Sequence, residues 1–133
     1  MRVVISPLIC EHLPRTVHGR RVVRFTQDFT VEIWCGDVLL FTFTVPAGFV
    51  SDLASIPRFF HRLLPPGEHD EEAAVHDRMY EIGVNRFFAD VFMWLLMLLL
   101  GRPAWKREAI FGGLRLFGWR AYREHARKRE GKE

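Results

Sequence analysis

The feature that most constrains the fold is a change in the spacing of apolar residues along the chain. Between Phe29 and Val45, apolar and polar residues alternate on either side of a Cys-Gly-Asp turn. This alternation is typical of an antiparallel hairpin with one face toward water. Pro46 ends the pattern, because proline has no N–H to donate to a neighbouring strand. Residues 2–5 and 21–25 are shorter candidate strands of the same sheet.

The second half of the chain has the spacing of helices. Acidic residues at 70–72 favour a helix start there, and Gly83 ends that helix. Pro103 is a good first-turn residue, and Gly112-Gly113 is the predicted break or kink in the last helical stretch. The predicted helices cover 70–82, 86–100 and 103–110, followed by a final stretch to about residue 127. Strands first and helices after predict an α+β fold, with an N-terminal antiparallel β-sheet packed against three to four helices.

A chain of 133 residues fits a single domain. We expect strands to about residue 50, a helical half over 51–127 and a frayed basic tail over 128–133. A core of this size needs neither a disulfide nor a metal to fold. The two cysteines, Cys10 and Cys35, have no paired spacing. They indicate a reducing compartment in which both thiols are buried. A disulfide between strands is the alternative.

The net charge of +3 is unevenly distributed. Residues 102–133 carry ten Lys or Arg against four Glu, a balance of +6, whereas residues 1–101 carry nine against twelve acidic residues, a balance of −3. The basic segment could contact nucleic acid or an anionic membrane, or it could be a solvated helix end. Sequence-specific nucleic-acid binding is not expected, because the aromatic residues in helical stretches favour the core: Trp94, Trp105, Trp119 and Tyr122.

The apolar run over residues 91–100 is too short to cross a bilayer, which takes about 20 apolar residues. It favours a buried helix, and a helix resting on a membrane surface stays open. The N-terminus has no charged segment followed by a long apolar one, so no signal peptide is expected.

The polar chemistry of the chain is concentrated on the helix predicted over 70–82. His76, Asp77 and Tyr80 share one face of it, since residues three and four apart are neighbours on a helix. Asp90 lies early in the next helix and can face His76 and Tyr80 if the two helices are antiparallel. Asp90 would then fix the tautomer of His76, whose other ring nitrogen could act as a general base on water. Asp77 could hold a hard cation such as Ca²⁺.

Asp52 is a further candidate for this site. It lies in a corner that follows Gly48, where it could join Asp77 in a metal or substrate site. The alternative is structural: Asp52 and Ser55 would stabilise the corner through backbone hydrogen bonds. The His-Asp-Tyr cluster has the same alternative, a closed hydrogen-bonded network that pins two helices.

Two motifs resemble an uncharacterised family common in bacteriophages and prophages, domain of unknown function 1353. They are Pro46-Ala-Gly-Phe-Val-Ser-Asp-Leu-Ala-Ser-Ile-Pro57 and Ala73-Ala-Val-His-Asp-Arg-Met-Tyr80, the latter followed by Ala89-Asp90. The resemblance covers about residues 40–122 and includes the Leu116–Trp119 region. It implies a phage origin and brings no established activity.

A narrower resemblance concerns His76-Asp77-x-x-Tyr80 with Asp90 on a following helix. This arrangement is similar to the active-site helix pair of phospholipases A2. The resemblance implies that His76 is the general base, that Asp77 binds calcium and that Asp90 orients His76, with Tyr80 bonded to Asp90. The disulfide framework of that family is absent here, and Pro46-Ala-Gly48 is the only nearby candidate for its calcium loop.

These observations lead us to expect a phage-encoded accessory protein with a His–Asp, metal-assisted hydrolytic site, acting on a phospholipid or another ester. The competing hypothesis is a non-catalytic virion or tail-assembly component, in which the cluster is structural. A membrane-associated regulator is a third. Expected partners are phage structural proteins or a lipid surface, and the expected location is the host cytoplasm or the virion. The sequence does not fix the oligomeric state.

Overall fold

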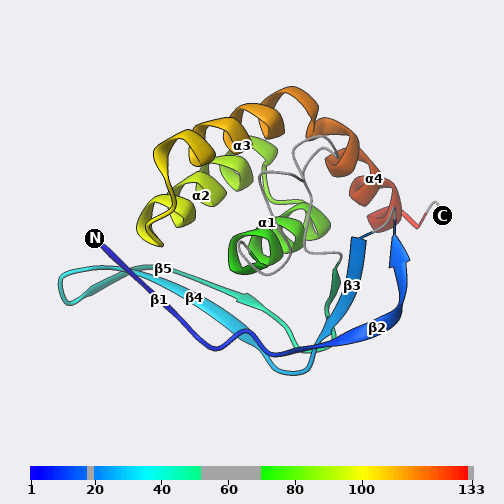
Figure 1. The fold of residues 1–133 in the computed structure, drawn as a ribbon, viewed down its shortest axis with the longest axis horizontal. Helices are drawn as coiled ribbons and strands as arrows, with labels where there is room; N and C mark the ends of the chain where they lie inside the picture. The colour runs from blue at the N-terminus through cyan, green and yellow to red at the C-terminus, as the bar shows by residue number, and fades with distance from the viewer. Residues whose placement is uncertain (18–19, 52–69, 132–133) are drawn as a thin grey trace. The chain divides into compact units, whose positions relative to one another are not determined.

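The computed structural model describes residues 1–17, 20–51 and 70–131. Strands occupy the N-terminal part and helices the C-terminal part (Figure 1), so the predicted α+β class is confirmed. The chain forms two compact units, Met1–Leu53 and Ala54–Glu133. The strands belong to the first unit and the helices to the second.

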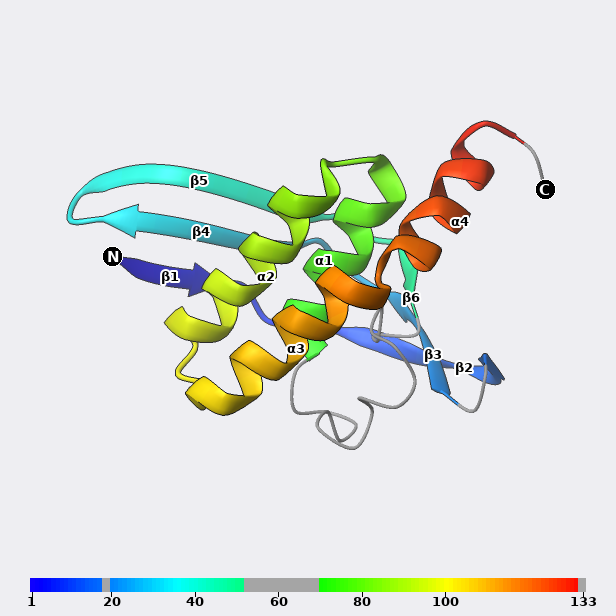
Figure 2. The same ribbon diagram turned by 90° about the horizontal axis from the view of Figure 1, so that it is seen from above.

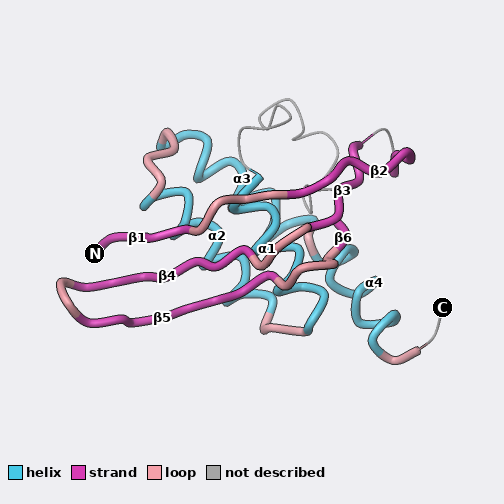
Figure 3. The backbone as a smooth tube through the Cα atoms, turned by 90° about the horizontal axis from the view of Figure 1, so that it is seen from below, coloured by secondary structure: helices cyan, strands magenta, loops and turns pink. Residues whose placement is uncertain are grey.

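The predicted hairpin is the centre of the first sheet, whose strand order is β1-β4-β5. Strands β4 (Phe29–Cys35) and β5 (Val38–Val45) form its antiparallel hairpin, and β1 (Arg2–Ile5) pairs with β4 (Figure 3). The apolar side chains of β4 are buried, and the residues between them are partly exposed. The period-two pattern therefore correctly predicted which face of this hairpin is covered.

A second antiparallel sheet has the order β2-β3-β6. It contains β2 (Cys10–Val17), β3 (Arg20–Phe25) and β6 (Val50–Ser51). The prediction that residues 21–25 belong to the same sheet as the hairpin was wrong, because they pair with β2 and β6. Strand β2 contains Pro14, and its register with β3 shifts between His12 and Thr16. A proline and a bulge both obscure the alternation by which a strand is recognised.

The prediction of two buried thiols was also wrong. Cys35 is exposed at the end of β4, beside the turn in which Gly36 has a φ of 59°, and Cys10 is only partly buried. Cys35 is a free cysteine.

The helical unit contains four helices within residues 70–131, as expected from the spacing of apolar residues. They are α1 (Asp70–Ile82), α2 (Arg86–Leu99), α3 (Ala104–Phe117) and α4 (Trp119–Arg129). Helices α1 and α2 have nearly the predicted bounds, and Gly83 ends α1 with a φ of 85°. Figure 2 shows α2 and α3 side by side and running in opposite directions.

The break in the last helical stretch is at Gly118 and not at the predicted Gly112-Gly113. Helix α3 continues through both glycines, with Ile110 and Leu114 buried on either side of them. A glycine inside a helix costs about 1 kcal/mol relative to alanine, which the burial of two large side chains can offset.

The core of the helical unit includes a cluster formed by α2 and α3. Its members are Met93, Met97, Ile110 and Leu114. The apolar run at 91–100 is thus only half buried, since Val91 and Leu98 are exposed on the other side of α2. Within the described ranges no helix is long and apolar enough to cross a membrane.

An ion pair with a buried acid and a partly exposed arginine links the start of α1 to the segment between α2 and α3. Glu72 is completely buried, and both of its carboxylate oxygens accept hydrogen bonds from Arg102, at 2.8 and 3.0 Å. Such a bidentate pair is strong, and removing the guanidinium takes two hydrogen bonds from a carboxylate in the interior.

We therefore expect Arg102→Ala to lower the free energy of unfolding by about 3 kcal/mol. Arg24→Ala is the matched control, because Arg24 pairs with Glu11 where both side chains are about half exposed. The control should cost less than about 1 kcal/mol. Urea denaturation measures both, and equal losses would show that the burial of Glu72 does not matter.

Candidate functional site

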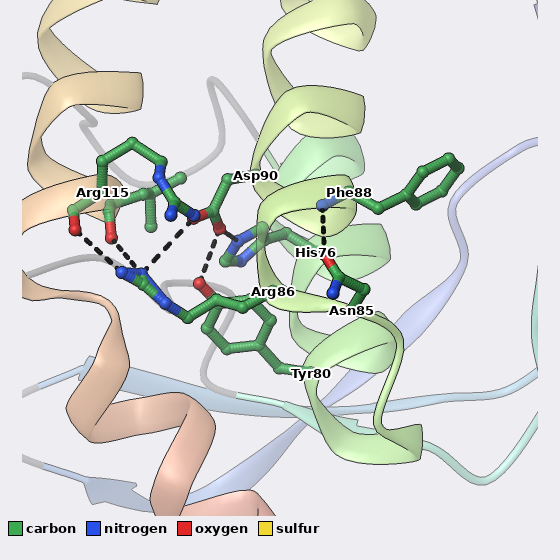
Figure 4. Close-up of polar contacts among 8 residues, drawn as sticks. His76, Tyr80, Asn85, Arg86, Phe88, Asp90 and Arg115 are labelled. Atoms are coloured by element: carbon green, nitrogen blue, oxygen red, sulfur yellow. Dashed lines mark hydrogen bonds and ion pairs between the residues drawn. The ribbon is translucent and has the colours of Figure 1, made fainter.

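The candidate site is organised by Asp90, a completely buried residue near the start of α2. One carboxylate oxygen, Oδ1, accepts hydrogen bonds from His76 Nε2 at 2.8 Å and from the Tyr80 hydroxyl at 2.6 Å (Figure 4). The other, Oδ2, accepts from Arg115 Nη1 at 2.8 Å, and Arg86 Nη1 lies 3.8 Å from it. Asp90 therefore joins α1, α2 and α3 at one point.

The local sequence explains why α2 presents Asp90 there. Asn85 caps the helix, its side chain accepting a hydrogen bond from the Phe88 N–H at 3.1 Å. Arg86 follows in the first turn, one turn before Asp90, and donates to the carbonyls of Leu114 and Arg115 near the end of α3. These carbonyls form the negative end of the α3 dipole, where a guanidinium is favourable.

The donors around Asp90 keep it ionised. Burial alone would raise the pKa of the Asp90 carboxyl, but the hydrogen bonds from His76 and Tyr80, with the nearby positive charges, lower it below its ordinary value. Burial and the hydrogen bond to Asp90 raise the pKa of Tyr80 well above its ordinary value. Tyr80 thus stays protonated and donates its hydroxyl hydrogen to the carboxylate.

This arrangement determines what the imidazole of His76 can do. Because Asp90 is an ionised acceptor, Nε2 carries a proton, and a neutral ring then has its lone pair on Nδ1. A nitrogen held in this state can accept a proton from water, and the carboxylate stabilises the imidazolium that forms. The predicted grouping of His76, Tyr80 and Asp90 agrees with these contacts.

Gly118, between α3 and α4, allows Tyr80 to reach this position. A Cβ atom at Gly118 would lie 2.9 Å from the Tyr80 hydroxyl oxygen and 2.6 Å from the carbonyl oxygen of Leu114. The Tyr80 ring also packs edge-to-face on Tyr122 of α4, with ring centroids 5.1 Å apart. The cluster around Asp90 is therefore in contact with every helix from α1 to α4.

Asp77 does not join this cluster. It is buried and pairs with His125 of α4, Oδ1 lying 3.2 Å from His125 Nε2. The other predicted metal ligand, Asp52, lies outside the described residues, as does Ser55. Within residues 1–17, 20–51 and 70–131, no three His, Cys, Asp or Glu side chains are placed to hold a metal. A carboxylate paired with an imidazole is not the oxygen-rich donor set that Ca²⁺ prefers, so metal ligation stays a prediction.

Sequence reasoning missed three of the side chains that contact the two aspartates. The contact of Arg86 with Asp90 could have been predicted from the sequence, because the two residues are one helical turn apart. Arg115 and His125 are on other helices than the aspartates that they contact. They are too far from these aspartates in sequence for a local pattern to predict the contacts. We had found no paired ligand spacing at His125, and its contact with Asp77 depends on how α4 packs on α1.

Residues 26–114 match the model of the family described as protein of unknown function DUF1353. The chain belongs to this family. The matched segment includes α1 and α2 with His76, Tyr80 and Asp90, but it ends before Arg115 and before the Leu116–Trp119 region that we had expected it to cover. No curated protein and no solved structure matches the chain.

We expect Gly118→Ala to destabilise the fold, because the added methyl group meets the Tyr80 hydroxyl and the Leu114 carbonyl. Gly112→Ala is the control: a Cβ there meets nothing within 4 Å, and helix propensity alone should stabilise it by about 0.5–1 kcal/mol. Adding Tyr80→Phe to Gly118→Ala should recover part of the loss, whereas strictly additive effects would refute the contact. Thermal unfolding of the three variants and of Tyr80→Phe measures this coupling.

The pH dependence of stability tests the charge state of Asp90. Because its pKa is lowered on folding, its ionised form stabilises the protein fully above the ordinary value of 3.8, and this contribution is lost as the pH falls through the folded-state pKa. The stability difference between wild type and Asp90→Asn should therefore be largest near neutral pH and shrink in acid. Urea denaturation from neutral pH to below the ordinary pKa checks this, and a constant difference would contradict it.

Proposed function

We propose that this protein is a phage-encoded accessory protein with a hydrolytic site, in which His76 is the general base and Asp90 its orienting partner. The observation that carries the proposal is the 2.8 Å hydrogen bond from His76 Nε2 to Asp90 Oδ1, with Tyr80 bonded to the same oxygen. The phage origin rests on the resemblance of the motifs to a phage and prophage family.

The proposed reaction is the hydrolysis of an ester, with a phospholipid as the favoured substrate. His76 Nδ1 takes a proton from water as the water oxygen attacks the ester carbonyl carbon. The resulting imidazolium is stabilised by Asp90 and returns the proton to the leaving alkoxide as the ester C–O bond breaks. The similarity of His76, Tyr80 and Asp90 to the phospholipase A2 helix pair supports this substrate class.

Burial sets a condition on this mechanism. His76 is 1 % exposed and Tyr80 and Asp90 are 0 % exposed. Water and ester must therefore reach Nδ1 through a local opening of the residues that cover His76. No step is assigned to a metal ion, because the described contacts of Asp77 do not supply a cation site.

The same burial favours a second candidate function, a non-catalytic virion or tail-assembly component. A sealed and fully bonded cluster stabilises helix packing without any reaction. In that case the role of His76 is to satisfy Asp90, and the function belongs to another surface of the molecule.

Substitution of His76 separates the two functions. In a hydrolase, His76→Ala should lower kcat for a fluorogenic phospholipid or a nitrophenyl ester by roughly 10²–10⁴-fold. Tyr122→Phe is the control, since the hydroxyl that it removes has, within the described residues, one long hydrogen bond, to the Gly83 carbonyl at 3.5 Å. Wild-type protein without esterase activity would exclude the hydrolase, and detection of the protein in purified virions would then support the structural role.

Two further measurements complete this test. If the cluster is structural, His76→Ala chiefly lowers the melting temperature, because Asp90 loses a donor while remaining buried. Chelation by EDTA tests the metal ligands predicted at Asp77 and Asp52. Activity that EDTA abolishes and Ca²⁺ restores would add a metal to the site, and activity unaffected by EDTA would remove it.

A further inference from the structure

The end of α3 and the start of α4 expose large apolar side chains, and one of them, Trp119, had been predicted to lie in the core. Leu116 is 68 % exposed, Phe117 44 % and Trp119 42 %. Exposed apolar residues grouped in this way point to a binding surface. Together with Arg120 and Arg123, these residues are called the α3–α4 surface.

The residues of the α3–α4 surface lie on both sides of the one-residue junction at Gly118. The Gly118 N–H donates to the Leu114 carbonyl, the Tyr122 N–H donates to the Gly118 carbonyl, and Gly118 has right-handed helical angles. Within α4, Arg120 and Arg123 are three residues apart and lie on one side of the helix, and Trp119 is one turn before Arg123. Leu116 and Phe117 end α3 directly before the junction.

Two guanidinium groups flank the exposed indole. Arg120 lies 5.3 Å and Arg123 4.9 Å from the Trp119 ring centroid. Neither arginine forms an ion pair with an acidic side chain in the described part of the chain. Among residues 1–17, 20–51 and 70–131, no carboxylate therefore neutralises the positive charge of these two arginines.

Its composition selects the kind of partner. Arginine beside tryptophan, leucine and phenylalanine is typical of protein surfaces that insert into the headgroup region of an anionic bilayer. Single-stranded nucleic acid needs open aromatic faces on which bases stack, but both guanidinium groups lie over the Trp119 ring. Leu116 is exposed as well, and a leucine side chain has no aromatic ring on which a base could stack.

We propose that the α3–α4 surface docks on anionic phospholipid membranes, with Leu116, Phe117 and Trp119 in the interface and Arg120 and Arg123 on lipid phosphates. This goes beyond the proposed hydrolysis and does not depend on it, since binding needs no turnover. The inferred surface differs from the Leu-rich segment of α2, whose residues Phe92, Met93, Leu96 and Met97 are buried.

Vesicle flotation tests the proposal with the full-length protein. Wild type should float with vesicles of phosphatidylcholine and phosphatidylglycerol and stay behind with phosphatidylcholine alone. Each arginine near an anionic surface contributes about 1 kcal/mol, roughly fivefold in partitioning, so Arg120→Gln/Arg123→Gln should weaken binding by about 25-fold. Raising the salt from about 0.1 M to about 1 M should do likewise, because it shortens the Debye length from about 10 to about 3 Å.

A matched control separates the surface from net charge. Arg2→Gln/Arg24→Gln removes the same charge from strands β1 and β3, where Arg2 also lies over an indole, that of Trp34, at 5.2 Å. This control should keep wild-type binding. Circular dichroism and melting temperature verify that both double variants are folded.

Fluorescence quenching locates the contact. Brominated phosphatidylcholine in the anionic vesicles should quench Trp119, so Trp119→Phe should lose most of the quenching. Trp105→Phe, which removes another exposed indole, should retain it. Equal binding to neutral vesicles, equal loss in the control, or binding of oligothymidylate instead of anionic vesicles would each overturn the proposal.

Discussion

The arrangement of helices α1–α4 depends on the neutralisation of one buried carboxylate, that of Asp90. An ionised carboxylate in the interior is expensive unless its oxygens are bonded and its charge is balanced. The chain meets this requirement with donors from different helices: His76 and Tyr80 from α1, and Arg115 from α3. Because each donor must come within about 3 Å of Asp90, the carboxylate limits how α1 and α3 can pack on α2.

The same requirement prepares His76 for chemistry and also restricts it. An imidazole with one nitrogen fixed by a carboxylate has a defined tautomer and a supported positive charge, which are the properties of a good general base. The contacts that fix it also bury it. The geometry of the His76–Asp90 pair therefore suits both an oriented base and a structural network, and these differ only in whether Nδ1 can be reached. Whether His76 is a base or a structural residue therefore depends on whether the residues around it open to expose Nδ1.

The features that could be predicted from the sequence are those set by residues that are close together along the chain. The β4–β5 hairpin, the bounds of α1 and α2, and the grouping of His76, Tyr80 and Asp90 all depend on spacings of a few residues within adjacent elements. Arg115, His125 and Gly118 acquire their roles only when elements distant in sequence approach one another, and a periodic pattern does not record such contacts. The exposure of Cys35 and Trp119 was mispredicted for a related reason, since residue type reflects average burial and not the position of an individual element.

Gly118 connects the interior of the helical unit to its surface. On the inner side, the absence of a Cβ leaves room for the Tyr80 hydroxyl that bonds to Asp90. On the outer side, Gly118 lies between Phe117 and Trp119, whose side chains are exposed. A displacement of the α3–α4 junction therefore changes the contact at Tyr80 as well as the exposed aromatic residues. A partner that binds the α3–α4 surface would contact the residues on both sides of Gly118, the glycine that faces the Tyr80 hydroxyl.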